Sequence, residues 1–341
     1  MNIMAPEVRA APRERPWLKI LSHYRQPNRV RSAVELVITV VPFVALWALT
    51  WVAVEYGHWW GLLLIIPAAA FLVRLFMIQH DCGHGSFFAY RHADDWTGRA
   101  LGVLTLTPYD YWRRAHAAHH ASAGNLDERG MGDITTLTVA EYHDLSRWGR
   151  LRYRLYRHPA VMFGVGPAWL FVLQQRLPFG MMRSGATPWV STMATNLGIA
   201  ALAIGLIWLC GVVPFLIIHL PIVVLAGAAG IWLFYVQHQF EDTHWAQGED
   251  WEFQHSALHG ASHYDLPAVL RWFTGNIGVH HVHHLSSRVP YYRLPEVLRD
   301  YPELRSLGRI TLLDSLRCVK LVLWDENRRK LVSFREARLT A

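Results

Sequence analysis

The chain contains the stretch Gly278-Val279-His280-His281-Val282-His283-His284-Leu285, which places four histidines within five residues. Three of them follow the spacing i, i+3, i+4, which gathers their imidazoles on one face of a helix. Two earlier stretches have related spacings, His80-Asp81-Cys82-Gly83-His84 and His116-Ala117-Ala118-His119-His120. Eight imidazoles in three clusters are typical of a site that holds more than one metal ion.

The types of side chain in these clusters restrict the metal. Neutral imidazole is a good ligand for Zn, Cu, Fe and Ni, whereas Mg and Ca prefer oxygen ligands. A structural zinc ion needs only four ligands, so eight histidines favour two metal ions over one. The chain has three cysteines, Cys82, Cys210 and Cys318, and no CxxC pair, so cysteine does not provide a separate zinc site.

The composition is that of a membrane protein. Hydrophobic residues make up 52% of the 341 residues and charged residues only 17%, and there are 16 Trp. The net charge of +7 raises the alternative of nucleic-acid binding. However, the basic residues flank apolar stretches and no nucleic-acid motif is present, so we expect contacts with anionic lipid and no nucleic-acid partner.

Apolar stretches of sufficient length to cross a bilayer occur in two pairs. The predicted spans are about residues 36–54, 59–78, 189–210 and 212–236. Arg74 lies near the end of the second span, where we expect its side chain to snorkel to the surface. A further apolar stretch, Ala160–Leu173, has only 14 residues, which favours a helix in the membrane interface or a re-entrant segment.

The distribution of basic residues predicts the orientation. The connectors within the two pairs of spans contain no Lys or Arg, whereas the N-terminal arm (residues 1–32), residues 79–188 and the chain after Val236 hold seven, twelve and thirteen. By the positive-inside rule these three segments, with all three histidine clusters, are cytoplasmic. The predicted fold is therefore all-α, with four transmembrane helices in two hairpins and a cytoplasmic helical cap that holds the metal ions.

At this level of detail the sequence resembles the membrane-bound fatty acid desaturases, which have three histidine boxes of these kinds. The similarity includes the residues around the boxes, from His80 to Ser86 and from Trp112 to Asp127. The stretches Phe234–Glu241 and Trp272–Gly278 resemble the acyl-lipid Δ12 (ω-6) branch. The resemblance covers roughly residues 75–300, so we assign residues 33–310 to a desaturase domain and residues 311–341 to a cytoplasmic tail.

The resemblance implies a di-iron centre with nine histidine ligands, of which the ninth lies outside the boxes. His238, just after the fourth predicted span, matches that position. The implied ligands are His80, His84, His116, His119, His120, His238, His280, His283 and His284. Candidates for the surrounding shell, mostly carboxylates that would accept the outer imidazole N–H, are Asp81, Asp127, Glu241, Asp242 and His281. The series His255, His259 and His263 is the alternative source of ligands.

The implied activity is that of an oxidoreductase that uses O2 to insert a cis double bond into a lipid acyl chain, with no catalytic residue beyond the metal centre. The sequence has no haem-attachment, dinucleotide or ferredoxin motif, so its two electrons come from ferredoxin or a cytochrome b5-like protein. The expected location is the bacterial inner membrane. The alternatives are a related hydroxylase, ketolase or alkane monooxygenase and, outside enzymes, a His-rich metal transporter. Against the transporter, only His219 lies well within a span.

Overall fold

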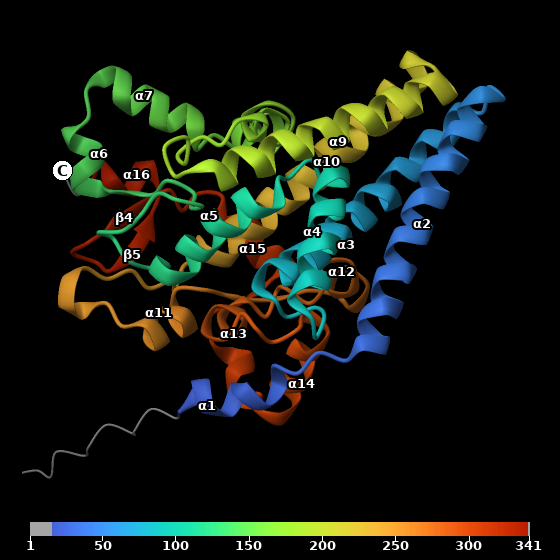
Figure 1. The fold of residues 1–341 in the computed structure, drawn as a ribbon. Helices are drawn as coiled ribbons and strands as arrows, with labels where there is room; N and C mark the ends of the chain where they lie inside the picture. Colours follow the sequence, from blue (N-terminus) through green and yellow to red (C-terminus); the bar gives the residue numbers. More distant parts are fainter. Residues whose placement is uncertain (1–15, 340–341) are drawn as a thin grey trace, which may run out of the picture.

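The computed structural model describes residues 16–339, which form a mostly helical protein (Figure 1). The described residues include four helical stretches that are long and apolar enough to cross a membrane. They are α2 (Arg29–Glu55), η2 with α3 (Trp59–Leu64 and Ile65–His84), α9 (Ala186–Cys210) and α10 (Val212–His238). The prediction of a mostly helical fold with four candidate spans is confirmed, whereas the arrangement of the spans as two transmembrane hairpins stays a prediction. Each of these helices extends by a few residues beyond at least one end of its apolar run. In α3 and α10 the additional residues include histidines of the predicted metal site.

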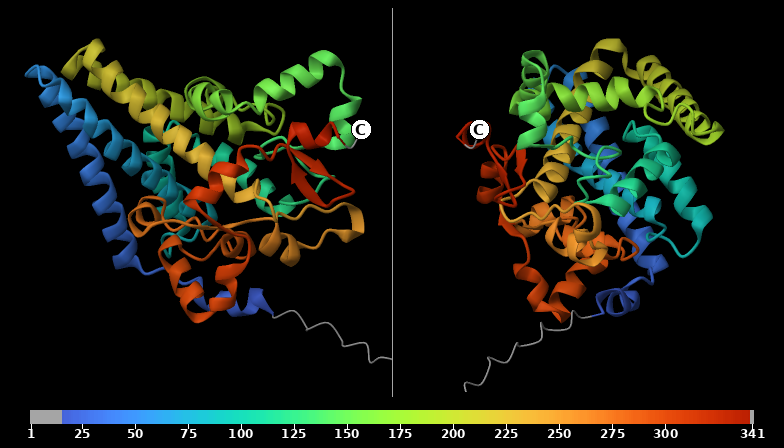
Figure 2. Two further views of the ribbon diagram at one scale, coloured as in Figure 1. Left: turned by 180° about the vertical axis from the view of Figure 1, so that it is seen from behind. Right: turned by 90° about the vertical axis from the view of Figure 1, so that its left-hand side faces the viewer.

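The four long helices pack in sequence-adjacent pairs and against one another across α3 and α10. Gly211, at φ 84°, is the single residue between α9 and α10, a backbone conformation that favours glycine. Figure 2 shows that the long helices come together at their turn ends and lie further apart toward a cap, in which most of the remaining elements are gathered. Their orientation relative to a membrane stays a prediction.

The cap consists of short helices and two small sheets. Its helices are α1 (Trp17–Leu21), α4 (Arg91–Leu104), α5 (Tyr109–Ser122), α6 (Val139–Asp144), α7 (Arg147–Tyr156), α11 (Phe253–His259), α12 (Ala268–Phe273), α13 (His280–Leu285), α14 (Leu294–Asp300), α15 (Leu312–Cys318) and α16 (Phe334–Ala337). Strand β4 (Leu323–Asp325) lies between β1 (Leu137–Thr138), to which it is parallel, and β5 (Lys330–Val332). Strand β2 (His263–Asp265) pairs with β3 (Arg309–Thr311) in parallel. Residues 311–339, assigned above to a tail, therefore pack onto the central segment of the chain.

The apolar stretch after α7 forms an irregular helix along α10. It consists of a π-helical turn η3 (Val161–Val165), α8 (Gly166–Ala168), a second π-helical turn η4 (Trp169–Leu173) and η5 (Gln174–Arg176). The ring of Phe163 lies 5.0 Å from that of Trp232 and 5.3 Å from that of Tyr235 in α10. This stretch therefore forms one wall of the space beside α10.

Arg74 does not snorkel to the surface, so that expectation is wrong. Its side chain is buried and forms an ion pair with Glu35 of α2. The guanidinium also donates to the carbonyl oxygen of Trp272 and lies 3.9 Å from the centre of its ring. Glu35 accepts a further hydrogen bond from the hydroxyl of Tyr291, at 3.2 Å. Burial of a charge requires such partners, and here they join α2, α3 and the cap.

Candidate metal centre

The nine histidines named above meet in the interior of the cap, at the ends of α3 and α10. They form two groups in which the ligand nitrogens lie within 4.8 Å of one another. The first group contains His80, His84, His116, His120 and His283, and the second contains His119, His238, His280 and His284. The fold therefore brings together histidines of four helices, from His80 to His284, so that each group could surround one metal ion.

Distances within each group are those of ligands around one ion. In the first group, the Nε2 atom of His116 lies 3.0 Å from that of His80 and 3.1 Å from that of His120. In the second, the Nε2 atom of His280 lies 3.0 Å from that of His238 and 3.1 Å from that of His284. Two nitrogens about 2.1 Å from the same metal ion, at about a right angle, lie about 3.0 Å apart.

Helix geometry explains how one histidine box contributes to both groups. Successive residues of an α-helix are about 100° apart around its axis. In α5, His116 and His120 therefore face the first group and His119 faces the second. In α13 the assignment is reversed, since His280 and His284 join the second group and His283 the first. The rings of His120 and His284 stack at 4.2 Å, where the two groups adjoin.

The protonation state of these side chains suits a metal. Burial, together with the neighbouring imidazoles, lowers the pKa well below its usual value in five members of the two groups that lie outside the candidate spans. They are His116, His120, His280, His283 and His284. These imidazoles are neutral near pH 7 and offer a lone pair, which is the form that binds a metal ion.

Two of the nitrogens that face the groups are buried without a hydrogen-bond partner in the described part of the chain. They are the Nε2 atoms of His84 and His119. An unpaired buried polar atom is costly, by about 1–3 kcal/mol. A metal ion bound to each group would satisfy these atoms, so the residues present fit two transition-metal ions.

Hydrogen bonds from the opposite ring nitrogens fix the orientation of three of these imidazoles. The Nδ1 atom of His80 lies 3.3 Å from Asp81, and the Nδ1 atom of His238 donates to the carbonyl oxygen of Gly260 at 3.2 Å. The Nδ1 atom of His119 contacts Asp133. Burial is the largest influence on the pKa of Asp133 and would raise it, but the hydrogen bonds from His119 and from the backbone of Gly130, together with the attraction of His119 and His238, outweigh burial, and the pKa is lowered. Such outer partners hold the ring and select the tautomer that leaves Nε2 free.

Comparison with known proteins identifies the family. A family profile described as fatty acid desaturase matches residues 57–310. The chain is also 42% identical to a fatty acid desaturase of Bacillus subtilis (strain 168) over 325 residues, which are 95% of this chain and 92% of that relative. The chain belongs to the fatty acid desaturase family. It is accordingly an oxidoreductase and an integral membrane protein.

More distant relatives of this desaturase have more specific names. An sn-1 acyl-lipid omega-3 desaturase (ferredoxin) of Synechocystis is 29% identical over 236 residues, which are 64% of this chain and 61% of the relative. An sn-1 oleoyl-lipid 12-desaturase of Arthrospira platensis is 23% identical over 272 residues, which are 75% of this chain and 72% of the relative. Both names specify an acyl lipid, and they differ in the bond that is formed.

Other candidates from the sequence occupy different places in the desaturase. Asp127 accepts a hydrogen bond from the backbone of Gly248 at 2.8 Å, while Glu241 and Asp242 are exposed, and the structure brings none of the three to a histidine of the centre. His281 faces away from both groups, and its Nε2 atom donates to the carbonyl oxygen of Leu304 at 2.9 Å. The structure places the alternative series, His255, His259 and His263, outside both groups.

The role of Asp133 does not follow from the sequence. It lies 14 residues after His119 in a loop, and the only local signal is its position in Gly130-Met131-Gly132-Asp133. A glycine-rich loop that brings a lone carboxylate back to a histidine cluster is a weak but physically interpretable indication of such a role.

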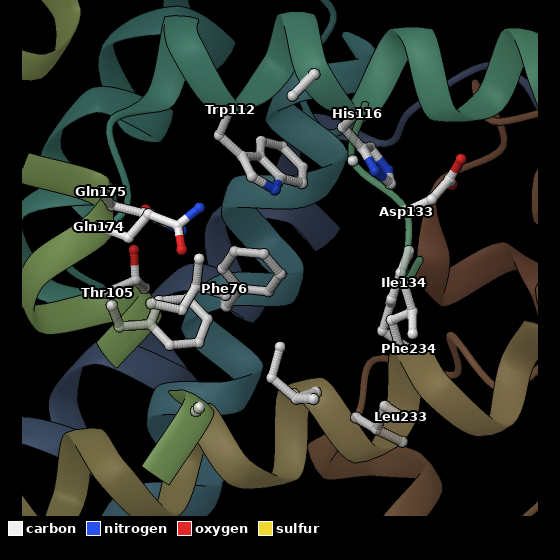
Figure 3. Close-up of a pocket in the computed structure, with 18 of the residues that line it drawn as sticks. Phe76, Thr105, Trp112, His116, Asp133, Ile134, Gln174, Gln175, Leu233 and Phe234 are labelled. Atoms are coloured by element: carbon white, nitrogen blue, oxygen red, sulfur yellow. The ribbon is translucent and has the colours of Figure 1, made fainter. Parts of the chain in front are cut away.

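A large cavity of about 990 Å³ adjoins the metal centre of the desaturase. His80, His116 and His280 reach its wall, and its other walls come mainly from apolar residues of α3, α5, α10 and the irregular helix after α7. Figure 3 shows Trp112, Phe76, Leu233 and Phe234 around it, with His116 and Asp133 on one side and Thr105, Gln174 and Gln175 on the opposite side. An apolar cavity with this opening onto the histidines is suited to a long hydrocarbon chain.

Proposed function

We propose that this desaturase inserts a cis double bond into the acyl chain of a membrane lipid, with O2 as co-substrate and two electrons from a partner protein. The observation that carries the proposal is the long apolar cavity whose wall includes histidines of both groups, His80 and His116 of the first and His280 of the second. An acyl chain in this cavity would present a methylene to the centre while the apolar walls exclude water.

The metal we propose is iron, two ions per chain, held by the nine histidines of the two groups. When bound, the irons would activate O2, which is reduced to two molecules of water by the two hydrogens from adjacent methylenes and by two electrons and two protons from outside the substrate. The protein contributes position. Asp81, Asp133 and the carbonyl oxygen of Gly260 hold three imidazoles in orientation, and the ring of Trp112 stacks on that of His116 at 4.6 Å.

The electron donor we propose is a ferredoxin, with a cytochrome b5-like protein as the alternative. The support comes from relatives whose names include ferredoxin, in Synechocystis and in Nostoc. The excess of arginine over acidic residues would favour an acidic donor by electrostatic attraction, provided that the cap faces the cytoplasm.

The bond we propose is of the Δ12 (ω-6) type, so that a monounsaturated C16 or C18 chain gains a second cis double bond. Distant relatives named sn-1 oleoyl-lipid 12-desaturase support this assignment, and those named omega-3 desaturase support the neighbouring bond toward the methyl end. Both assignments place the new bond on the methyl side of an existing one.

Product analysis tests the proposal. The desaturase is expressed with a compatible ferredoxin in a host that makes only monounsaturated lipids, and the fatty acids are analysed by gas chromatography and mass spectrometry. We expect a dienoic acid. A hydroxy or keto acid without a diene, from protein shown to contain iron, would assign the chain to the hydroxylase or ketolase reaction instead.

A further inference from the structure

The cavity has a limb that follows α10 away from the metal centre. Its lining residues on this helix run from Gln237, next to His238, back to Val223. Fourteen residues of α-helix correspond to about 21 Å. This part of α10 belongs to an apolar candidate span, so the limb lies at the level of the hydrocarbon and not of the head groups.

Two glycines of α10 face this limb, and their surroundings differ. A Cβ atom at Gly227 would lie 2.9 Å from the Cδ2 atom of Phe171 and 3.2 Å from the Cβ atom of Pro167. Gly227 therefore allows the irregular helix to approach α10 closely. A Cβ atom at Gly230 would have no heavy atom of another part of the chain within 4 Å, so nothing in the packing of the protein requires a glycine there.

Glycine within a helix is destabilising by about 0.5–1 kcal/mol relative to alanine. Packing requires a glycine neither at Gly230 nor at Gly205 of α9, but Gly230 alone of the two lies in the wall of the cavity. Gly230 lies about seven residues, or about 10 Å, along α10 from Gln237, roughly half-way down the limb. A side chain at this position would project into the space that the cavity provides.

We infer that Gly230 is a specificity-determining residue, which keeps the limb open for the methyl end of a long acyl chain. This inference rests on the proposed function. The charged or polar head group stays at the membrane surface, so the end of the chain that enters a limb at hydrocarbon level is the methyl end. The length of the limb beyond the metal centre then limits how many carbons follow the new double bond.

The experiment compares Gly230→Leu with a matched control, Gly205→Leu. Gly205 is also helical, and a Cβ atom there would also have no heavy atom of another part of the chain within 4 Å, but it is exposed in α9 and does not line the cavity. The full-length variants are expressed in a host supplied with medium-chain and long-chain acyl substrates. For Gly230→Leu we expect the ratio of long-chain to medium-chain conversion to fall by at least about tenfold, since one methylene in an apolar pocket already changes selectivity by about 10–200-fold. Gly205→Leu should retain the ratio of the wild type.

Binding provides a second measurement that does not depend on turnover. Long-chain and medium-chain fatty acids are added to the purified, metal-free proteins in detergent, and the shift of the thermal unfolding temperature is recorded. Gly230→Leu should lose the shift caused by the long chain and keep that caused by the medium chain. The inference is overturned if this variant has the chain-length profile of the wild type in both measurements. A wild type that makes no unsaturated lipid would refute the proposed function, whereas the binding shifts would still decide the role of Gly230.

Discussion

Single residues around the metal centre differ in how directly their role follows from the sequence. The eight histidines of the boxes have spacings that a helix converts into a common face, so their meeting in one site could be predicted from the boxes alone, whereas their division between two groups could not. His238 needed the resemblance to a family, because a lone histidine after an apolar span has no internal signature. The contact between Asp133 and His119 could be found only in the structure, because it depends on the path of the loop that carries Asp133.

Replacement of Asp133 should weaken the second histidine group. In Asp133→Asn, His119 loses the carboxylate that holds its ring, and we expect metal affinity or turnover to fall by about 10–100-fold. Iron content per chain and turnover measure the effect. The control is Asp127→Asn, on the surface near Gly248, which should remain close to the wild type. Equal iron content and activity in the two variants would contradict this role of Asp133.

The contribution of His238 can be separated from that of a histidine within the same helix. His238→Ala removes one of the four nitrogens of its group and should abolish turnover, as His119→Ala should. His219, also in α10, stacks on Phe215 and belongs to neither group, so His219→Ala should remain largely active. Turnover and bound iron are measured in all three variants. Full activity and iron content in His238→Ala would show that it is not a ligand.

At the scale of the elements, the apolar runs predicted the long helices well and the rest of the chain less well. Four apolar runs, of which only the second contains a charged residue (Arg74), correspond to four long helices, since length and hydropathy are properties of the local sequence. The strands β1, β4 and β5 could not be predicted because they are only two or three residues long, and because β1 and β4 pair across more than 180 positions. The π-helical turns beside α10 depend on packing that no local pattern reveals.

The contact between α2 and α3 provides a prediction about stability. In Arg74→Leu the carboxylate of Glu35 stays buried without its main partner, and breaking a buried pair in this way costs about 3–5 kcal/mol. The double variant Glu35→Leu with Arg74→Leu should recover most of this loss. Unfolding in a denaturing detergent gives the free energies.

The control for this pair is Arg31→Leu. Arg31 also pairs with Glu35, at 2.7 Å, but its side chain is 57% exposed. An exposed ion pair contributes about 0–1 kcal/mol, so this variant should be nearly as stable as the wild type. If Arg74→Leu were as stable as Arg31→Leu, the buried pair would have no structural role.

For the whole molecule, the histidine groups connect parts of the chain that are distant in sequence. They join α3, α5, α10 and α13 in the interior. A bound ion stabilises the folded state by about 2.7 kcal/mol at a hundredfold excess over its dissociation constant. Removal of iron by a chelator should therefore lower the thermal unfolding temperature, and Fe²⁺ should restore it while Ca²⁺ should not. An unchanged unfolding temperature after complete removal of iron would contradict this prediction.

The orientation in the membrane is a second prediction for the whole molecule. The charge asymmetry predicts that both ends of the chain and the cap lie in the cytoplasm and that the turns at Gly57 and Gly211 lie outside. A cysteine introduced at Gly57 should react with an impermeant reagent in intact cells. A cysteine introduced at the exposed Glu303 should react only after the membrane is opened. Labelling of Glu303→Cys in intact cells would refute the orientation.

The buried pair between Glu35 and Arg74 also has a consequence for biogenesis. An arginine that enters the bilayer alone costs about 2.5–3.5 kcal/mol, so α2 and α3 are best inserted together, as one neutral unit. Another partner of Arg74, the carbonyl oxygen of Trp272, is 198 residues further along the chain. At about 5–20 residues per second, the ribosome needs about 10–40 s to synthesise that interval. During this interval the first pair of helices lies in the membrane without the hydrogen bond from Arg74 to Trp272. A chaperone or insertase that binds this intermediate would protect the unpaired donor of Arg74 until the rest of the chain is made.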